Sequence, residues 1–351
     1  MISILSEHLS DNPTVKSLVF GTVVFTCLAS VAGFAGRLWW VLDLASHFRV
    51  QYVLVLSVLC LILVLIRHGR FAVLSSVFAL LNLMLVLPLF WGSARSSSSS
   101  SSTARAMMMN VNTSNTNYSI ALAVIKSYAP DFLFVEEVDR RWMAELQQLD
   151  VEYPYSISRP REDNFGIAFY SKRPFVTSDI LDVGQAGTPS VLVRFELEGL
   201  DFFILGTHTL PPVNAAYARF RDIHLAEIPE VVKSLDRPLL LLGDLNATRW
   251  SHSFRRLIRD SGLSDGARGR GYQPTWPAGM LPLLIPIDHC LHSPGIQILN
   301  MQIGPAVGSD HYPVIVDFSL RVGDGTVSYR LTLAARGRSG AELRLRSRAA
   351  A

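Results

Sequence analysis

The chain has 351 residues, of which 49% are hydrophobic and 17% are charged, and its formal net charge is +3. The charged fraction is below the roughly 25% usual for a soluble domain, which excludes a single ordinary soluble domain and indicates a part that lies in a membrane. Residues 1–95 hold six Lys and Arg against three Asp and Glu, and residues 96–320 hold 19 against 24. The acidic centre argues against tight, sequence-independent binding of long nucleic acid.

Three charge-free apolar stretches come first in the chain, at residues 18–36, 50–66 and 71–92. A helix needs about 20 apolar residues to cross a bilayer, with a range of about 17–25. A secretory signal peptide is the alternative for the first stretch, but acidic residues precede it, no small-residue cleavage site is evident and two more stretches follow. We therefore predict an all-α transmembrane region of three helices within residues 1–92, in contact with the lipid bilayer.

The turn Arg67–Arg70 between the second and third stretches holds the densest cluster of basic residues near a span. Basic loops favour the cytoplasm, so this turn predicts that the C-terminal part lies outside. Four arginines count against this orientation, namely Arg37, Arg49, Arg95 and Arg105. The stretches contain no Asp, Glu, Lys or Arg, which usually mark a transport pathway, so an anchor is favoured over a transporter.

Residues 93–106 form a predicted linker, whose centre is a run of seven serines that cannot build a core. Short apolar runs then alternate with helical spacing over residues 107–320. The predicted strands are 106–109, 132–135, 166–170, 191–197, 202–205, 239–242, 285–287 and 314–318, and the predicted helices are 118–128, 215–235 and 253–261. Residues 321–351 are Arg-rich and poor in aromatics, so we predict a disordered tail.

Polar residues follow five of the predicted strands and precede the last one. They are Asn110 and Asn112, Glu137, His208, Asp244 and Asn246, Asp288, and finally Asp310 and His311. A single Asp after a strand is usually a turn residue or a helix cap, but strand ends are also where α/β folds collect functional groups. Carboxylates suit a hard divalent cation, and amides and imidazoles suit a phosphate. The combination predicts a site for both.

The same residues stand in six motifs. They are Asn110-Val111-Asn112, Phe134-Val135-Glu136-Glu137-Val138, Gly206-Thr207-His208, Gly243-Asp244-Leu245-Asn246, Ile287-Asp288-His289 and Gly308-Ser309-Asp310-His311-Tyr312-Pro313. In this order they resemble the endonuclease/exonuclease/phosphatase superfamily, which includes DNase I, exonuclease III and neutral sphingomyelinases. The resemblance covers about residues 106–320. It implies an α/β, DNase I-like four-layer sandwich of two packed β-sheets flanked by helices.

Residues 164–168 and Thr275-Trp276-Pro277 are most similar to the bacterial branch with an N-terminal multi-span anchor. The resemblance implies that Glu137, rather than Glu136, binds Mg²⁺ or Mn²⁺, with Asp310 and Asn112 beside it. Exonuclease III-type enzymes often have Asp in place of Asn112, and an amide is a weaker ligand, so a second metal position is in doubt. We expect Glu136 to be a neighbouring surface or hydrogen-bonding residue.

The resemblance also implies catalytic roles. Asp244 would orient or deprotonate the attacking water, and Asn246 and Asn110 would hold the phosphate. His311, paired with Asp288, would contact the scissile phosphate, because a carboxylate partner favours the imidazolium. His208 would be a candidate general acid for the leaving group.

Two weaker candidates for substrate binding are Trp276 and Arg249. The first could stack on a base or cover a lipid, and the second could bind a phosphate. Packing under its own loop is at least as good an interpretation of Trp276, and a solvated helix face is an equal alternative for Arg249 and the arginines after it. His289 and His292 are expected to be structural.

These observations predict an integral protein of the bacterial inner (plasma) membrane that carries a divalent-metal-dependent phosphoesterase. It would hydrolyse a phosphodiester or phosphomonoester by in-line attack of an activated water, on a phospholipid or a nucleic acid. The alternatives are a catalytically silent, membrane-tethered module that binds phosphate or lipid, and a DNA or RNA nuclease.

Overall fold

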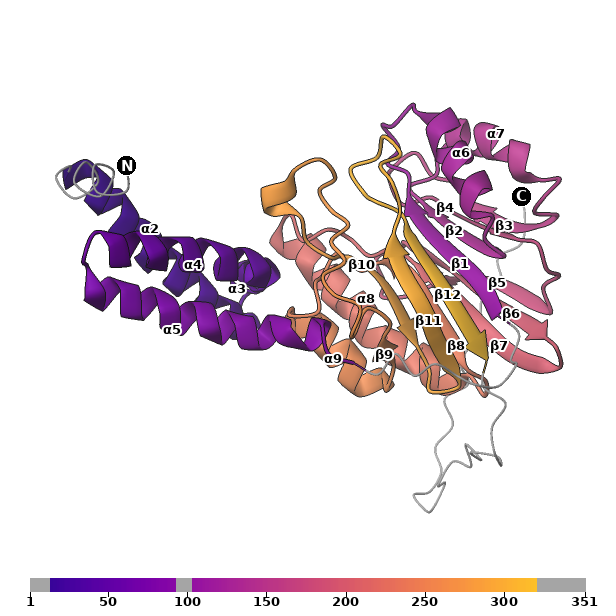
Figure 1. Cartoon of the computed structure of the whole chain (residues 1–351). Helices are drawn as coiled ribbons and strands as arrows, with labels where there is room; N and C mark the ends of the chain where they lie inside the picture. Colours follow the sequence, from indigo (N-terminus) through magenta and orange to yellow (C-terminus); the bar gives the residue numbers. More distant parts are fainter. Residues whose placement is uncertain (1–12, 93–102, 321–351) are drawn as a thin grey trace, which may run out of the picture.

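The computed structural model describes residues 13–92 and 103–320, as a helical region (residues 13–92) and a sandwich domain (residues 103–320) (Figure 1). The serine run expected to be a linker and the Arg-rich tail at residues 321–351 lie outside the described residues. The first strand begins at Thr103, so the segment expected to be a linker up to residue 106 already includes its first residues.

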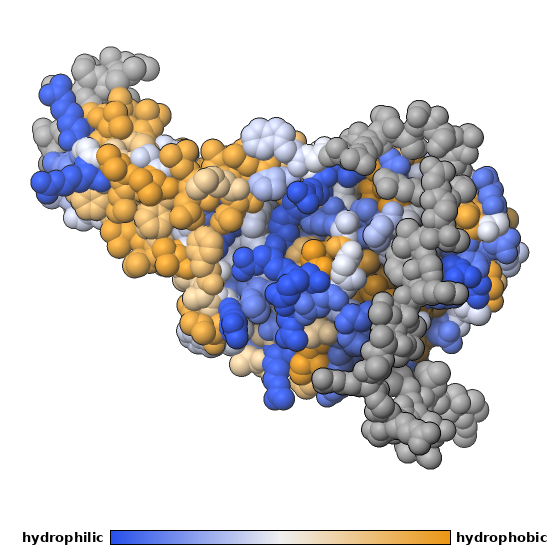
Figure 2. Space-filling view, turned by 90° about the horizontal axis from the view of Figure 1, so that it is seen from below, coloured by the Kyte–Doolittle hydropathy of each residue, from blue (hydrophilic) through white to orange (hydrophobic). Residues whose placement is uncertain are grey.

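The helical region contains α2 (Pro13–Ala32), α3 (Trp40–Leu44), α4 (Arg49–Leu65) and α5 (Gly69–Val86). Three helical segments, residues 13–35, 40–65 and 69–89, are long and apolar enough to cross a membrane. Large apolar side chains point outward from each of them, for example Phe25, Leu61 and Met84. The surface of this region is accordingly mostly apolar, in contrast to the sandwich domain (Figure 2). The expected all-α region of three apolar helices is confirmed.

The sandwich domain is built from two six-stranded sheets. The first sheet contains β1 (Thr103–Asn110), β2 (Phe132–Glu136), β3 (Tyr155–Arg159), β4 (Ile167–Ser171), β11 (Ile296–Ile303) and β12 (Val314–Leu320), in the order β11-β12-β1-β2-β4-β3. The second contains β5 (Thr177–Asp182), β6 (Pro189–Leu197), β7 (Leu200–Thr207), β8 (Leu239–Asp244), β9 (Ser264–Asp265) and β10 (Asp288–His292), in the order β5-β6-β7-β8-β10-β9.

The helices cover the outer faces of the two sheets (Figure 1). Helices α6 (Tyr118–Tyr128) and α7 (Arg140–Leu146) pack on the first sheet, and α8 (Ala215–Ser234) and α9 (His252–Ser261) pack on the second. The central core lies between the sheets, where six aromatic rings interlock around Phe132 and Phe195. The central strands are buried on both faces, which explains their continuous apolar runs. The predicted four-layer, DNase I-like sandwich is confirmed.

Several elements differ from the sequence prediction. The interpretation of residues 285–287 as a strand was wrong, because Ile285 forms only an isolated bridge with Trp276 and β10 starts at Asp288. Strands β3, β5 and β9 were not predicted, since their residues are mostly exposed or half-buried and no apolar run marks them. Strand β11 was also missed, because a register shift between Ile298 and Asn300 interrupts its alternation.

The packing of the two sheets explains why the Gly206-Thr207-His208 motif at the end of β7 begins with glycine. A Cβ at this position would lie 2.5 Å from the ring of Phe134 on β2 of the facing sheet. Glycine is therefore needed here, because the facing sheet leaves no room for a Cβ at this point.

We predict that Gly206→Ala lowers the free energy of unfolding by about 1–3 kcal/mol, the usual cost of overpacking a core. Adding Phe134→Leu should recover part of this loss, because it removes the ring that the new methyl group meets. Chemical denaturation of the full chain in detergent would measure both variants. Equal stability of Gly206→Ala and wild type would contradict the proposed close packing.

Candidate active site

The residues expected to form the site meet at one edge of the sandwich because of strand direction. Each sheet has one parallel pair at its centre, β1 with β2 and β7 with β8, and the carboxyl ends of these four strands face the same edge. Strand β10 is antiparallel to β8, with Asp288 opposite Asp244. Asp288 therefore reaches this edge from the beginning of its strand, although the sequence had suggested the end of one.

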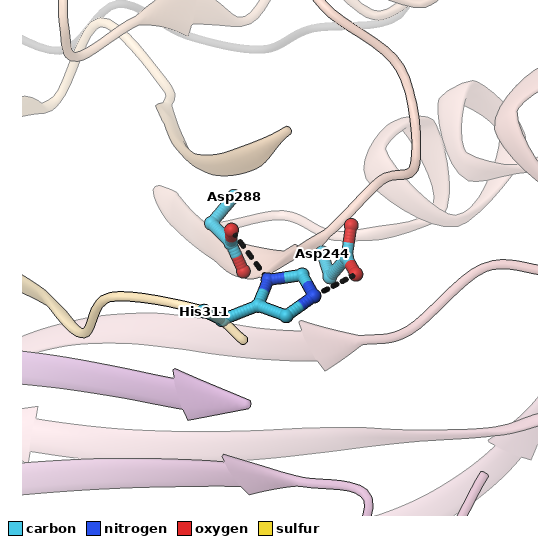
Figure 3. A group of neighbouring side chains, drawn as sticks. All are labelled: Asp244, Asp288 and His311. Atoms are coloured by element: carbon cyan, nitrogen blue, oxygen red, sulfur yellow. Dashed lines mark hydrogen bonds and ion pairs between the residues drawn. The ribbon is translucent and has the colours of Figure 1, made fainter. Parts of the chain in front are cut away.

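Asp244, Asp288 and His311 form the centre of the site (Figure 3). Nδ1 of His311 lies 2.9 Å from Oδ2 of Asp288, and its Nε2 lies 3.7 Å from Oδ2 of Asp244. Burial alone would lower the pKa of His311, but the charge and hydrogen bond of Asp288 and the charge of Asp244 raise it to about 10. His311 is therefore an imidazolium at neutral pH, held between two carboxylates.

Glu137 occupies the turn after β2, with a left-handed backbone (φ 61°). Its carboxylate accepts hydrogen bonds from Nδ2 of Asn110 at 3.0 Å and from the backbone N of Thr113 at 3.3 Å. Thr113 also donates through its hydroxyl to the carbonyl of Glu137. Burial raises the pKa of Glu137, and these donors oppose the shift. Such strained backbones persist where the surroundings fix them, often at functional sites.

Asp310 lies beside Asn112 and Trp276. Its Oδ1 accepts from Nδ2 of Asn112 at 2.6 Å, and its Oδ2 accepts from Nε1 of Trp276 at 3.0 Å. Burial would raise the pKa of Asp310, but these two hydrogen bonds and the charge of His311 lower it. The side-chain oxygen of Asn112 accepts from the backbone N of Ser114 at 2.9 Å. Asn112 is thus oriented as a donor that positions Asp310, rather than with its oxygen toward a metal.

Glu136 differs from the sequence expectation of a surface residue, although it does form a hydrogen bond. It is fully buried, and its Oε1 accepts from the backbone N of Asp244 at 2.9 Å. Its Oε2 has no hydrogen-bond partner among the described residues. Burial and the charges of Asp244 and Asp288 raise the pKa of Glu136 well above its usual value. It joins the end of β2 in one sheet to the end of β8 in the other.

His208 lies next to Asp244, with its Nε2 3.6 Å from Oδ2 of that residue. Burial, followed by the charge of His311, lowers the pKa of His208 to about 3, so the ring is neutral. Its Nδ1 is buried without a hydrogen-bond partner among the described residues. A neutral ring can donate or accept a hydrogen bond but cannot supply a proton as an imidazolium, which argues against the expected role as general acid.

Asn246 stands in a left-handed turn (φ 46°) directly after Asp244. Its backbone N donates to Oδ1 of Asp244 at 2.8 Å, and its Nδ2 donates to the carbonyl of Thr209 at 2.9 Å. An amide nitrogen carries two hydrogens, so Asn246 can give the second one to a phosphate oxygen.

The two weaker candidates have different surroundings. Trp276 belongs to the site through its hydrogen bond to Asp310, and its ring lies 6.4 Å from that of His311. The guanidinium of Arg249 pairs with Asp265 of β9. That ion pair occupies the group that was expected to bind a substrate phosphate. His289 is structural, since it is buried and its Nε2 lies 2.7 Å from the carbonyl of Ala247.

The donor set fits a hard divalent cation. Five carboxylates gather here, those of Glu136, Glu137, Asp244, Asp288 and Asp310, and among the described residues they form ion pairs with histidine alone and with no Lys or Arg. Burial and mutual repulsion raise the pKa of Glu136 and Asp244. A cation bound by carboxylate oxygens would relieve this uncompensated negative charge.

Comparison with known families agrees with this geometry. The sequence profile of the Endonuclease/Exonuclease/phosphatase family matches residues 109–311, more than half of the chain. The chain belongs to this family. Proteins of the Endonuclease/Exonuclease/phosphatase family are generally phosphoester hydrolases. The matched range begins just before the Asn-x-Asn motif and ends at His311, so it includes the first five motifs and the last one up to His311.

Solved structures with the family's fold include two bacterial ones. The endonuclease/exonuclease/phosphatase from Bacteroides vulgatus is 18% identical, with 63% of this chain and 100% of that chain covered and a TM-score of 0.53. The one from Beutenbergia cavernae is 20% identical, with 62% and 72% covered and a TM-score of 0.50. The human Nocturnin catalytic domain, solved with a bound sulfate anion, is 19% identical, with 62% and 95% covered and a TM-score of 0.52. No curated protein sequence matches the chain.

We predict that Mn²⁺ raises the melting temperature of the full chain in detergent by several degrees, because a ligand that binds only the folded state stabilises it. Glu137→Gln and Asp310→Asn should each abolish the shift. Glu152→Gln, an exposed carboxylate, is the matched control and should leave it intact. Differential scanning fluorimetry with and without EDTA would measure the shift. An equal shift in all four proteins would place the cation elsewhere.

Proposed function

We propose that the protein is a membrane-anchored, divalent-metal-dependent phosphoesterase that hydrolyses a phosphodiester, or a phosphomonoester, by in-line attack of a water molecule. The observation that carries the proposal is the buried imidazolium of His311 between Asp244 and Asp288, next to the carboxylates of Glu137 and Asp310. A positive group beside a water-orienting carboxylate suits the charge that develops on a phosphoryl group.

Each residue has a defined task in this proposal. The carboxylate of Asp244 orients the attacking water and takes its proton, and the backbone N of Asn246 holds that carboxylate in place. His311 donates from Nε2 to a phosphate oxygen, because its Nδ1 is engaged by Asp288. Asn246 and Asn110 bind the phosphate through their amides. The neutral ring of His208, whose Nε2 lies 3.6 Å from Oδ2 of Asp244, would help to orient that carboxylate.

Glu137 and Asp310 would hold Mg²⁺ or Mn²⁺, and Asn112 would orient Asp310. The bound cation would neutralise phosphate oxygens and stabilise the leaving oxygen. This assignment is supported by the exclusively oxygen-based donors and by the absence of Lys or Arg ion pairs to these carboxylates among the described residues.

A lipid phosphodiester at the bilayer surface is the substrate that we propose. The segment 276–284 connects the site with the helical region, because Ala278 N donates to the carbonyl of Asp310 and Gln51 of α4 donates to the carbonyl of Leu284. Between these two contacts, Met280, Leu281 and Leu283 are 51%, 78% and 45% exposed. In Figure 1 this segment projects from the sandwich on the side of the helical region. Exposed apolar side chains beside membrane helices favour contact with lipid.

The nuclease alternative has one observation in its favour. A zebrafish (D. rerio) TDP2 structure with the same fold was solved with a single-strand DNA product, at 16% identity and a TM-score of 0.52. The acidic balance of residues 96–320 and the apolar segment beside the site favour a lipid over a nucleic acid. The silent-module alternative is disfavoured because all motif positions hold chemically competent residues.

We also propose that the sandwich domain lies outside the inner membrane of a bacterium. The basic turn Arg67–Arg70 joins α4 to α5 at the ends remote from the sandwich, so a cytoplasmic turn places the domain on the other side. Two of the four arginines that oppose this orientation are engaged in the structure. Arg49 is buried against Ser30 and Asn82, and Arg105 pairs with Asp317.

We predict that Asp244→Asn lowers kcat on a bis-aryl phosphodiester by about 10²–10⁴-fold, the usual contribution of a general base. EDTA should abolish the wild-type activity, and Mg²⁺ or Mn²⁺ should restore it. Asp179→Asn, an exposed carboxylate on the edge strand β5, is the matched control and should be fully active. A folded wild-type chain without turnover on any phosphodiester or phosphomonoester would overturn the proposed function.

We predict that Leu281→Asp and Met280→Asp lower turnover of bilayer-embedded substrates at least tenfold but spare the soluble bis-aryl ester, because a charge opposes entry into lipid. The screen would compare DNA, RNA, sugar phosphates, and vesicles containing sphingomyelin or phosphatidylinositol phosphates. Val151→Asp replaces an apolar residue that is 95% exposed and serves as the control. Faster hydrolysis of DNA or RNA than of every lipid would favour the nuclease.

A further inference from the structure

We propose that the helical region is a positioning element of the active site: Asp43 and His47, which lie between α2 and α4, hold the loop of residues 245–252 that carries Asn246. The proposal rests on the function proposed above, in which Asn246 binds the phosphate. It gives the helices a second role in addition to that of an anchor. Its evidence is a set of buried polar contacts between the helical region and this loop.

Asp43 on α3 forms the centre of these contacts. The residue is only 2% exposed, and its carboxylate accepts three hydrogen bonds from the sandwich domain. The donors are Oγ of Ser251 at 2.7 Å, the backbone N of His252 at 2.8 Å and Nη2 of Arg221 at 3.2 Å. Ser251 and His252 stand where the loop enters α9, so Asp43 fixes the end of the loop.

Arg221 of α8 connects Asp43 to the active site. Its guanidinium is 1% exposed and donates through Nη1 to the carbonyl of Asn246 at 3.1 Å. The same group donates through Nη2 to Asp43. One guanidinium therefore bridges a carboxylate of the helical region and the backbone of the residue that we assign to phosphate binding. The planar fork of arginine favours such a fixed, two-sided contact.

His47 holds the middle of the loop. Its Nδ1 lies 2.9 Å from Oγ1 of Thr248 and accepts from the backbone N of Thr248 at 3.3 Å. Thr248 is fully buried and stands two residues after Asn246. Trp250 adds a third point, since its Nε1 donates to the carbonyl of Leu85 on α5 at 3.1 Å. The helical region thus contacts the loop at residues 248, 250, 251 and 252, and reaches Asn246 through Arg221.

The conformation of Asn246 explains why such support matters. Its φ of 46° lies in the left-handed region, which asparagine adopts more readily than most residues other than glycine, but the position of its backbone still has to be fixed by its surroundings. Within the sandwich domain, the backbone N of Asn246 donates to Asp244 and its side-chain amide donates to the carbonyl of Thr209. The carbonyl is held by Arg221, whose guanidinium is oriented jointly by Asp43 at 3.2 Å and by the adjacent Asp222 at 2.8 and 3.0 Å.

The chemistry of the contact indicates positioning rather than adhesion alone. Apolar residues of similar volume often stabilise a contact between two parts of a protein as well as a buried ion pair does. Holding the helical region and the sandwich domain together would therefore not require buried charged residues. Here Asp43, Arg221 and His47 are all nearly inaccessible to solvent. Buried charged and hydrogen-bonded groups require a defined geometry, and that geometry is transmitted to the loop.

The first experiment tests whether the contact holds the two parts together. A protease site replaces the serines at 96–102 in the full chain, which is then cleaved in detergent and analysed by size exclusion. We expect the severed sandwich domain to elute with the helical region and to keep its activity. The double variant Asp43→Ala/His47→Ala should release it. A severed wild-type domain that separates and remains fully active would overturn the proposal.

The second experiment tests positioning. Asp43→Asn in the uncleaved chain should lower kcat on the soluble bis-aryl ester about tenfold or more, with little change in KM, since small displacements of aligned groups can cost up to about 10²-fold. In an Asn246→Ala background the same substitution should lower kcat by a smaller factor, because the amide is gone and only the backbone N that holds Asp244 is left to displace. Ser76→Ala removes a hydrogen bond within α5 only, from Oγ of Ser76 to the carbonyl of Val73, and is the control. Additive losses in the double variant would show a general loss of stability and overturn the proposal.

A readout independent of turnover separates the two proposals. Hydrogen exchange should accelerate at residues 246–252 in Asp43→Asn but not in Ser76→Ala. If the wild type hydrolyses no phosphoester, the proposed function fails, while this exchange still decides whether the helical region orders the loop. Unchanged exchange over residues 246–252 in Asp43→Asn would overturn the positioning role in either case.

Discussion

The structure depends on the crowding of five carboxylates at one edge of the sandwich domain. Burial raises the pKa of Glu136, Glu137 and Asp244, and the charge of His311 compensates only part of the negative charge. Such a site lowers the stability of the fold that holds it. The two sheets, their central parallel pairs and the amide donors around the carboxylates are the means by which the chain keeps these charges together.

Much of this edge was predictable, because strand ends and motif spacing are local properties of the sequence. Asp244 and Asn246 follow a run of four leucines that could only be a buried strand. The sequence placed Asp288 at the correct edge of the sandwich but at the end of a strand, whereas Asp288 begins β10. The edge is the same because β10 is antiparallel to β8, and an antiparallel strand starts where its neighbour ends. The burial of Glu136 was not predictable, since it depends on the second sheet packing over β2.

The contact between the helical region and the loop of residues 245–252 could not be predicted from the sequence, for a different reason. Asp43 and His47 stand in a short gap between two apolar stretches, where polar residues are expected at a membrane surface. Their partners Arg221, Ser251 and Thr248 follow 178 to 208 residues later, and no local pattern links positions so far apart. Only the folded chain shows that these residues form one network.

The sandwich domain docks at the open end of the α4–α5 hairpin, opposite the basic turn, and this has a kinetic consequence. The α2–α4 connection and the end of α5 each contact the domain, so it is held at two points and cannot swing about a single hinge. If the helices span a bilayer as we propose, a catalytic edge fixed in this way would scan the plane of that bilayer at constant height. Its rate would then follow the mole fraction of substrate in the surrounding leaflet, rather than the concentration of that substrate in the bulk solution.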